Sequence, residues 1–196
     1  MLKGAACVFN LSPSPAFHLK KGHFGRSDTT GLTVKNISGL SIVALIAHKG
    51  QTEALRREMR DRFGLELPAH PHHISDGQTD FIWAGPEQWL VMGADTDLYT
   101  KLASPFAATI DQSGGRSLLR LSGPKLRDIL RKGVTLDLHP DVFKPHDVAL
   151  TSIAHISAVL WLLDAQSCEI AVARSFAGSF WHWLSVSAAE YGYEVG

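Results

Sequence analysis

The sequence predicts an α+β fold made of two similar halves that together form one compact domain. The predicted elements run strand, helix, two strands and helix, and then strand, helix, three strands and helix. Strands that are apolar on both alternating sets of side chains indicate sheets that are covered on both faces. The chain has 196 residues, of which 45% are hydrophobic, so it is long enough to bury such a core.

The overall charge and the two cysteines exclude several classes of function. Nineteen basic residues balance nineteen acidic ones, so there is no net charge to attract nucleic acid or an anionic membrane. No apolar run approaches the roughly 20 residues that a membrane-spanning helix needs. Cys7 and Cys168 lie far apart and fit neither a disulfide framework nor a metal-binding pair. We therefore expect a soluble, cytoplasmic protein with neither a nucleic-acid nor a membrane partner.

The first half is expected to begin after a flexible arm. Residues 1–30 contain prolines and broken apolar patches and predict the arm, residues 31–112 form the first α+β half, and residues 113–196 form the second. The stretches at 32–36 and 40–48 are rich in aliphatic and β-branched residues, which is typical of strands.

Helical spacing and glycine mark the next elements. From Thr52 onward, Leu55, Met59 and Phe63 recur at helical spacing, and Gly64 predicts the end of that helix. Two strands follow at 80–85 and 88–93, and Asp95 can cap a helix that runs through about Leu102.

The second half repeats this plan. Residues 116–122 alternate as a strand, and Ser122, Gly123 and Pro124 predict the start of a helix that Gly133 ends. Strands are expected at about 148–156, 158–163 and 168–172. Ser175 then predicts the cap of a last helix. The apolar side of that helix comprises Phe176, Phe180, Trp183, Leu184 and Tyr191.

Each half is thus expected to be a ferredoxin-like α/β repeat with its helices on one face of the sheet. Strands that are apolar on both faces need a second cover. The two small sheets either bury each other or share a buried face with a partner protein.

The stretch DQSGGRS at 111–117 has the composition of an active site. Asp111 and Ser113 would need a histidine beside them for hydrolysis, and the serine does not lie in a G-x-S-x-G motif. Gly114 and Gly115 match no phosphate-binding pattern. A hydrogen-bonded turn that leads into strand 116–122 is the favoured interpretation, and no catalytic residue is assigned.

The segment HPHH at 70–73, with Asp76 nearby, is the candidate metal site. His72 and His73 are adjacent and point apart in an extended chain, and no cysteine or Glu lies near. A metal-dependent enzyme built on His70, His72 and His73 is the weakest hypothesis, so no metal ligand is assigned.

Two further features suggest binding. Arg116 follows a flexible glycine pair and is a weak candidate for contact with folate or another anion. Trp181 and Trp183 lie about 160° apart on one helix, so they cannot both face the same core. Trp181, beside Ala177 and Ala188, is therefore the candidate for a partner interface, although a segment of the same chain could also cover it.

Four stretches carry a resemblance to a known family. They are GPEQWLVMG (85–93), DQSGGRSLLRLSGPKLRDILRKG (111–133), LDLHPDVF (136–143) and RSFAGSFWHWL (174–184). In their order and separations they resemble the gamma subunit of heterotetrameric sarcosine oxidase, over nearly the whole chain from about Gly31. More distantly, the D-x-S, G-R and L-x-L-x-G-P run resembles the repeat of the glycine cleavage T-protein, which implies a T-protein-like fold.

The resemblance implies an oxidoreductase complex for sarcosine catabolism and one-carbon metabolism. Such a complex demethylates sarcosine to glycine, passes the one-carbon unit to tetrahydrofolate and forms hydrogen peroxide. It implies alpha, beta and delta subunits as partners, with FAD, FMN, NAD and zinc held by those chains and no cofactor bound by this one. This chain would then be a non-catalytic subunit. The alternative is a small stand-alone folate-binding protein of the T-protein superfamily.

Overall fold

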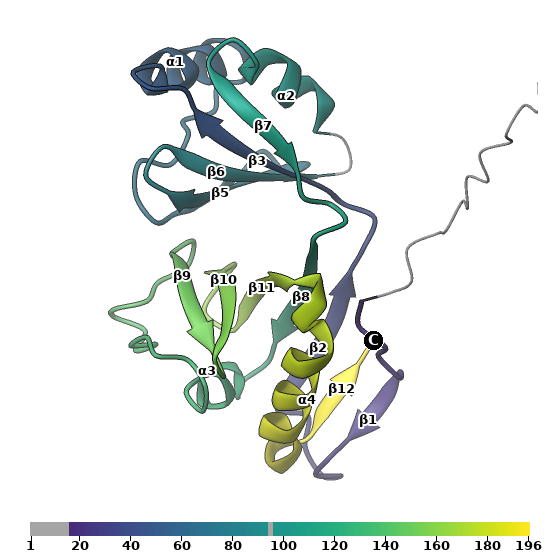
Figure 1. Ribbon diagram of the computed structural model, residues 1–196. Coiled ribbons are helices and arrows are strands. Elements are labelled where there is room, and N and C mark those ends of the chain that lie inside the picture. Colours follow the sequence, from purple (N-terminus) through teal and green to yellow (C-terminus); the bar gives the residue numbers. More distant parts are fainter. Residues whose placement is uncertain (1–15, 94–95) are drawn as a thin grey trace, which may run out of the picture.

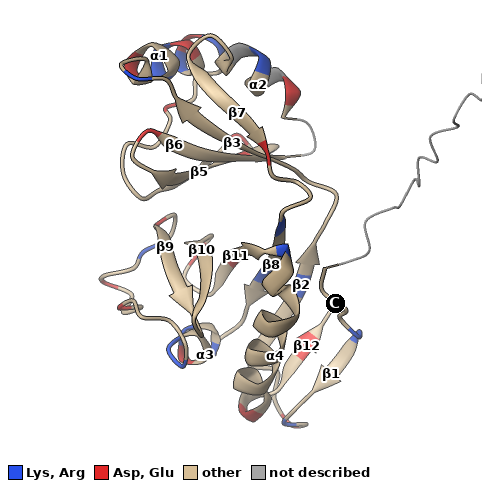
Figure 2. Ribbon diagram, viewed as in Figure 1, with Lys and Arg blue, Asp and Glu red and all other residues tan. Residues whose placement is uncertain are grey.

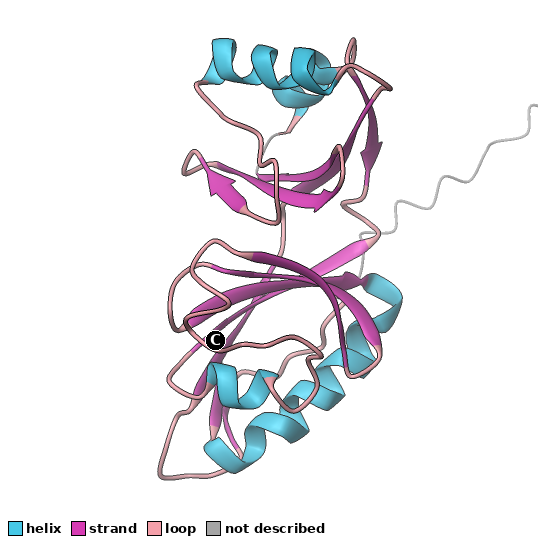
Figure 3. Cartoon of the chain, turned by 90° about the vertical axis from the view of Figure 1, so that its left-hand side faces the viewer, coloured by secondary structure: helices cyan, strands magenta, loops and turns pink. Residues whose placement is uncertain are grey.

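The computed structural model describes residues 16–93 and 96–196 (Figure 1). Two β-sheets lie face to face, and helices cover the outer face of each sheet, as Figure 3 shows. The predicted α+β class, with mostly antiparallel sheets packed together, is confirmed.

The smaller sheet belongs mostly to the first half of the chain. Its strands are antiparallel in the order β4-β5-β6-β3-β7, and α1 and α2 cover its outer face. The fully buried Leu55 and Met59 attach α1, and Gly64, at φ +65°, ends it as predicted. The bounds are β3 (Ser41–Ala47), α1 (Thr52–Phe63), β4 (His73–Ser75), β5 (Thr79–Gly85), β6 (Gln88–Gly93), α2 (Asp97–Ala103) and β7 (Ala107–Asp111).

The larger sheet has the order β1-β12-β2-β8-β11-β10-β9. All its neighbours are antiparallel except β12 and β2. The stripe predicted in the short α3 is buried against this sheet together with α4. The bounds are β1 (Gly22–Phe24), β2 (Leu32–Ile37), β8 (Arg116–Ser122), α3 (Leu126–Leu130), β9 (Val148–Ile153), β10 (Ile156–Leu162), β11 (Ser167–Ala173), α4 (Ala177–Ala188) and β12 (Tyr193–Val195), with 3₁₀ turns at Arg174–Phe176 and Ala189–Tyr191.

The facing sides of the two sheets form a core of their own, which we call the inter-sheet core. The smaller sheet contributes Ile82 and Leu90, and the larger sheet contributes Leu118 and Trp161, all of them almost completely buried. This packing explains why strands such as β3 are apolar on both faces. Of the two covers that the sequence allowed for these strands, the structure shows the first, because the sheets bury each other.

The division into halves differs from the expectation in two respects. Strand β2 lies within residues 31–112, but it pairs with β8 and β12 in the sheet of the second half. Part of the expected arm is also ordered, since β1 pairs with β12 and Phe17 is buried in the core under the larger sheet. The physical reason is that Leu32 and Val34 of β2, together with Phe17, are buried in the core under the larger sheet, so these segments belong with the second half.

The sequence predicts capping residues for the starts of α4 and α2. Ser175 lies in a 3₁₀ turn and does not cap α4, which begins at Ala177 after Phe176, without a side-chain cap. Asp95, the predicted cap of α2, lies outside the described residues. None of the helices in residues 16–93 and 96–196 has the length and apolar character needed to cross a membrane.

Candidate functional site

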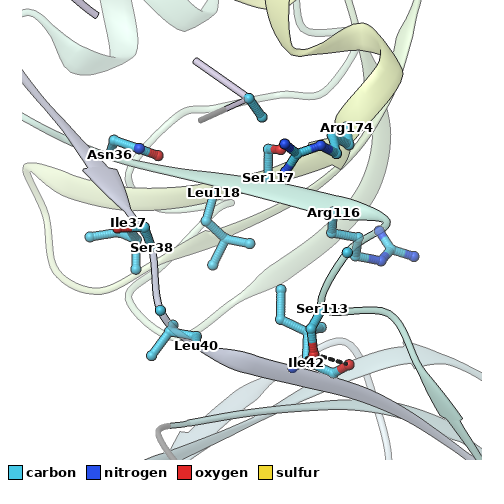
Figure 4. Close-up of a pocket in the computed structure, with 13 residues that line it drawn as sticks. Asn36, Ile37, Ser38, Leu40, Ile42, Ser113, Arg116, Ser117, Leu118 and Arg174 are labelled. Carbon is cyan, nitrogen blue, oxygen red and sulfur yellow. Dashed lines mark hydrogen bonds between the residues drawn. The ribbon is translucent and has the colours of Figure 1, made fainter. Parts of the chain in front are cut away.

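The chain passes between the sheets in two neighbouring segments, and a cavity of about 500 Å³ lies between them. One segment leads from β2 to β3, and the other leads from β7 to β8. The ladder between β2 and β8 ends at the pair Ile37 and Leu118, and the segments meet again where the Gln112 N–H donates to the Ile42 carbonyl at 2.7 Å. Between these two points the strands separate, and residues from 36–42 and 113–118 line the opening with Ala16 and Arg174 (Figure 4).

The DQSGG stretch forms one end of this cavity as a hydrogen-bonded turn. The carboxylate of Asp111 accepts hydrogen bonds from the N–H of Ser113 at 2.8 Å and from its hydroxyl at 2.7 Å. The Ser113 hydroxyl oxygen in turn accepts from the N–H of Ile42 at 2.9 Å. The bonds from Ser113 keep the pKa of Asp111 below its usual value. The predicted turn into β8 is confirmed, and the pair ties two crossing segments together.

Two arginines line the cavity, and the sequence analysis singled out only one of them. Arg116 donates from Nε to the side-chain oxygen of Gln112 at 2.5 Å, and burial lowers the pKa of its guanidinium. Arg174 lies in the turn before α4. Its own backbone N–H donates to the Gly115 carbonyl at 2.9 Å. Sequence reasoning missed Arg174 because only the pairing of β8 with β11 places it beside Arg116.

The histidine segment closes a second junction between the sheets. The N–H of His73 donates to the His146 carbonyl at 2.8 Å, and the N–H of Val148 donates to the Pro71 carbonyl at 3.3 Å. His73 is buried, and its Nε2 atom lies 2.8 Å from Oδ1 of Asp80. Partial burial lowers the pKa of the neighbouring His72. Within residues 16–93 and 96–196, no three His, Cys, Asp or Glu side chains gather to hold a metal ion. The segment joins the sheets through its backbone.

Glu169 is a buried carboxylate that the sequence analysis did not identify. It faces the smaller sheet from β11, and burial raises its pKa, whereas Arg120 lowers it. Arg120 donates to it from Nε at 2.8 Å and from a terminal nitrogen at 2.6 Å. A buried acid with a raised pKa is a common sign of an active site, but this one is held by an arginine and does not line the cavity. Its contacts indicate a structural role in joining β8 and β11.

Helix α4 presents an uncharged surface to the outside. Its sequence AGSFWHWLSVSA contains no Lys, Arg, Asp or Glu, and Figure 2 shows it free of the charges that cover α1. Four exposed residues fall within about 100° of the helix circumference. We call this group, Gly178, Ser179, His182 and Val186, the outer face of α4.

The three interface candidates lie around this outer face in different ways. Ala177 and Ala188 are almost fully buried in the core under the larger sheet, so their proposal as contact residues is corrected. Small residues at these positions let the helix approach its own sheet. Trp181 is half-buried, and its ring packs edge-on against Tyr193 at 5.9 Å, so part of the chain covers it. Trp183 packs on Gly133, where a Cβ would lie 2.5 Å from the indole. The two tryptophans therefore flank the outer face of α4 on opposite sides.

Comparisons with known proteins show the family to which the chain is related. The model of the family described as the sarcosine oxidase gamma subunit family matches residues 49–190. A sarcosine oxidase subunit gamma from Corynebacterium sp. strain P-1 is 34% identical, over 92% of both chains. Another from an Arthrobacter species is 28% identical, over 93% of this chain and 92% of the relative.

Solved structures extend the comparison to the fold. A chain of the heterotetrameric sarcosine oxidase from Corynebacterium sp. U-96, in complex with pyrrole 2-carboxylate, superposes with a TM-score of 0.74 at 27% identity, covering 86% of this chain and 88% of that one. The glycine cleavage aminomethyltransferase T from Bartonella henselae gives a TM-score of 0.56 at 13% identity, covering 80% of this chain and 46% of that one, and shares the fold alone. From the family match and the full-length relatives, we conclude that the chain belongs to the sarcosine oxidase gamma subunit family.

Proposed function

We propose that this chain is the gamma subunit of a heterotetrameric sarcosine oxidase and that it acts by docking, without contributing a catalytic group. The observation that carries the proposal is the extent of the match. The relatives align over 92% or more of this chain, and the superposed structure covers 86% of this chain and 88% of that one. The match thus spans most of the length of a gamma subunit of such an assembly.

The geometry of the reactive side chains supports a non-catalytic role. The Asp111 carboxylate accepts from the N–H and the hydroxyl of Ser113, and the Ser113 hydroxyl oxygen accepts from the Ile42 N–H, so both side chains are occupied in holding the turn. Burial raises the pKa of the Cys168 thiol, which keeps it protonated and unreactive. The side chains of Asp111 and Ser113 are thus engaged in structural contacts, and the Cys168 thiol is kept unreactive by burial.

The partners and cofactors follow from this assignment as proposals. The alpha, beta and delta subunits would surround this chain, and they would hold the FAD, FMN, NAD and zinc and the tetrahydrofolate site. A cytoplasmic location stays a prediction from the sequence. The complex would oxidise sarcosine to glycine with formation of hydrogen peroxide.

The outer face of α4 is the surface that we propose for docking on a larger subunit. Interface centres are depleted in charged residues and enriched in aromatic ones. This face carries no Lys, Arg, Asp or Glu, two tryptophans flank it, and the exposed Phe176 lies at the start of the helix. The charges on α1, at the opposite end of the molecule, make that helix a solvated surface by comparison (Figure 2).

Reconstitution tests the proposed function. Co-expression of this chain with alpha, beta and delta subunits should give an assembly with one copy of each, measured by native mass spectrometry. The purified chain alone should show neither flavin absorption nor sarcosine-dependent formation of hydrogen peroxide. Turnover by the lone chain, or an intact and active complex formed in its absence, would contradict the proposal.

The stand-alone folate-binding protein is the second candidate. The solved T-protein shares the fold, but this chain spans less than half of that protein's length. The match to gamma subunits favours the subunit role, because it covers 92% of such a relative at 34% identity, whereas the match to the T-protein covers 46% of that chain at 13% identity.

A further inference from the structure

A row of four histidines crosses the junction between the two sheets. Its members, which we call the histidine row, are His70, His72, His73 and His146. The first three belong to β4 and the residues before it, and His146 belongs to the segment before β9. Ring centroids lie 5.5 Å apart for His70 and His72 and 5.9 Å apart for His72 and His146. The ring of His73 stacks on that of His146 at 5.8 Å, so the row is continuous from one segment to the other.

The backbone of the same residues holds the two sheets together. The N–H of His73 donates to the His146 carbonyl at 2.8 Å, and His72 forms a β-bridge with Asp147. On the side of the smaller sheet, the N–H of Trp83 in β5 donates to the His72 carbonyl at 3.1 Å. A force between the side chains of the histidine row therefore acts directly on the bridge between the sheets.

The histidine row has more rings than it has carboxylates beside it. Oδ1 of Asp147 lies 4.0 Å from Nδ1 of His72, and Oδ1 of Asp80 on β5 lies 2.8 Å from Nε2 of His73. In the described parts of the chain, no ion pair joins either of the other two histidines to a carboxylate. Full protonation would place four positive charges beside two negative ones, and like charges at these separations repel each other.

The larger sheet adds one ion pair near His73. Glu169 on β11 is paired with Arg120 at 2.6 Å, and the charges of Glu169 and His73 act on each other. Burial raises the pKa of Glu169, so the folded chain takes up this proton more readily than the unfolded chain does. The contribution of Glu169 to stability therefore grows as the pH falls. It opposes the effect of the histidine row, which is isolated below by variants that leave this ion pair in place.

Burial adds to the cost of protonation at His72, which lies within the row. Desolvation is the largest cause that lowers the pKa of His72, the charges of His70 and His146 lower it further, and Asp147 opposes them. The folded chain therefore binds this proton less tightly than the unfolded chain. The contribution of His72 to stability is complete above about pH 6.5 and is lost as the pH falls from there through the folded pKa.

We propose that the histidine row makes the junction between the sheets sensitive to acid, so that protonation of its rings separates the segment at β4 from the segment before β9 and breaks the backbone bridge between them. Imidazoles change charge between about pH 5 and 8, which sets the range of the switch. The ring of His73 lies 6.3 Å from that of Trp161, so opening the junction uncovers this end of the inter-sheet core. The switch is a property of this chain's own fold and is independent of docking through the outer face of α4.

Titration of the full chain, followed by the NMR signals of the histidine Cε1 protons, tests the repulsion within the row. His146→Asn removes one ring, and asparagine tolerates the φ of +71° at this position. This variant should raise the pKa of His72, because it removes a neighbouring positive charge. His155→Asn is the matched control, since His155 has a φ of +67° in the turn at the other end of β9, and it should leave the pKa of His72 unchanged. No change in His146→Asn, or equal changes in both variants, would overturn the proposal.

Amide hydrogen exchange tests the opening of the bridge. Between pH 7.5 and 5.5, the protection factors of the His73 and Val148 amides, corrected for the intrinsic exchange rate at each pH, should fall at least about fivefold in the wild-type chain. A tenfold difference in proton affinity between the closed and the open junction, summed over the row, gives a change of this size. The double variant His72→Gln/His146→Asn should show a fall of less than about twofold, and His155→Asn should behave as the wild type does. Each protein is compared with itself at two pH values, so a general loss of stability in a variant does not imitate the result. Equal falls in the wild type and the double variant, or no fall in the wild type, would contradict the proposal.

Discussion

Replacing Val186 by glutamate is expected to separate assembly from folding. Val186 is 64% exposed on the outer face of α4, so the lone chain should lose no more than about 1 kcal/mol of its free energy of unfolding. The better helix propensity of glutamate offsets its unfavourable position near the helix C-terminus. In the assembly the same carboxylate would be buried without a partner, and affinity for the other subunits should fall by at least about 30-fold, or 2 kcal/mol.

Val142→Glu is the matched control for this change. Val142 is 57% exposed in the loop between α3 and β9, away from the outer face of α4, and receives the same charge. Its variant should assemble with unchanged affinity, measured by surface plasmon resonance against the remaining subunits. Equal losses for the two variants, or a Val186→Glu chain that assembles normally, would remove the outer face of α4 as the docking surface.

Trp161→Ala is expected to destabilise the lone chain more than any change on its surface. The indole is fully buried in the inter-sheet core, and truncation of a buried Trp costs about 3–5 kcal/mol, since it removes apolar contacts and leaves a cavity. Trp161→Phe keeps an aromatic ring and loses an indole N–H that has no hydrogen-bond partner, so it should cost less than about 1.5 kcal/mol. Denaturant unfolding monitored by circular dichroism measures both.

The Trp161→Ala variant tests whether the inter-sheet core stabilises the isolated chain. If the sheets are held together by their own facing side chains, Trp161→Ala must lower the stability of the chain without any partner present. A loss below about 1 kcal/mol would mean that the facing sides contribute little to stability in the isolated chain. The apolar strands would then need a partner to cover them.

Local features of the fold could be predicted from the sequence because their causes are local. The spacing of Leu55 and Met59 and the position of Gly64 specify α1, and the pattern of β3 indicates burial on both faces. The parallel pairing of β12 with β2 could not be predicted, since it joins opposite ends of the chain and depends on tertiary packing. For the same reason the boundary between the halves was misplaced at β2.

The candidate site was predictable only in part. Arg116 and the turn at Asp111 and Ser113 stand out in the sequence, but the cavity exists because two distant segments cross between the sheets. Ser117 and Arg174 lie in stretches that carry the family resemblance, but nothing in the sequence places either residue beside a cavity. Ala177 and Ala188 show the opposite problem, because a small residue on a helix suits a partner interface and a close approach to its own sheet equally well.

Amide hydrogen exchange over α4 is the most direct test of docking. Exchange at residues 177–188 should be slower in the assembled oxidase than in the lone chain, because contact on the outer face of α4 suppresses opening of the helix. Exchange at residues 52–63 in α1, which lies at the opposite end of the molecule, should not change. Unchanged exchange over α4 together with slower exchange over α1 would contradict docking through α4.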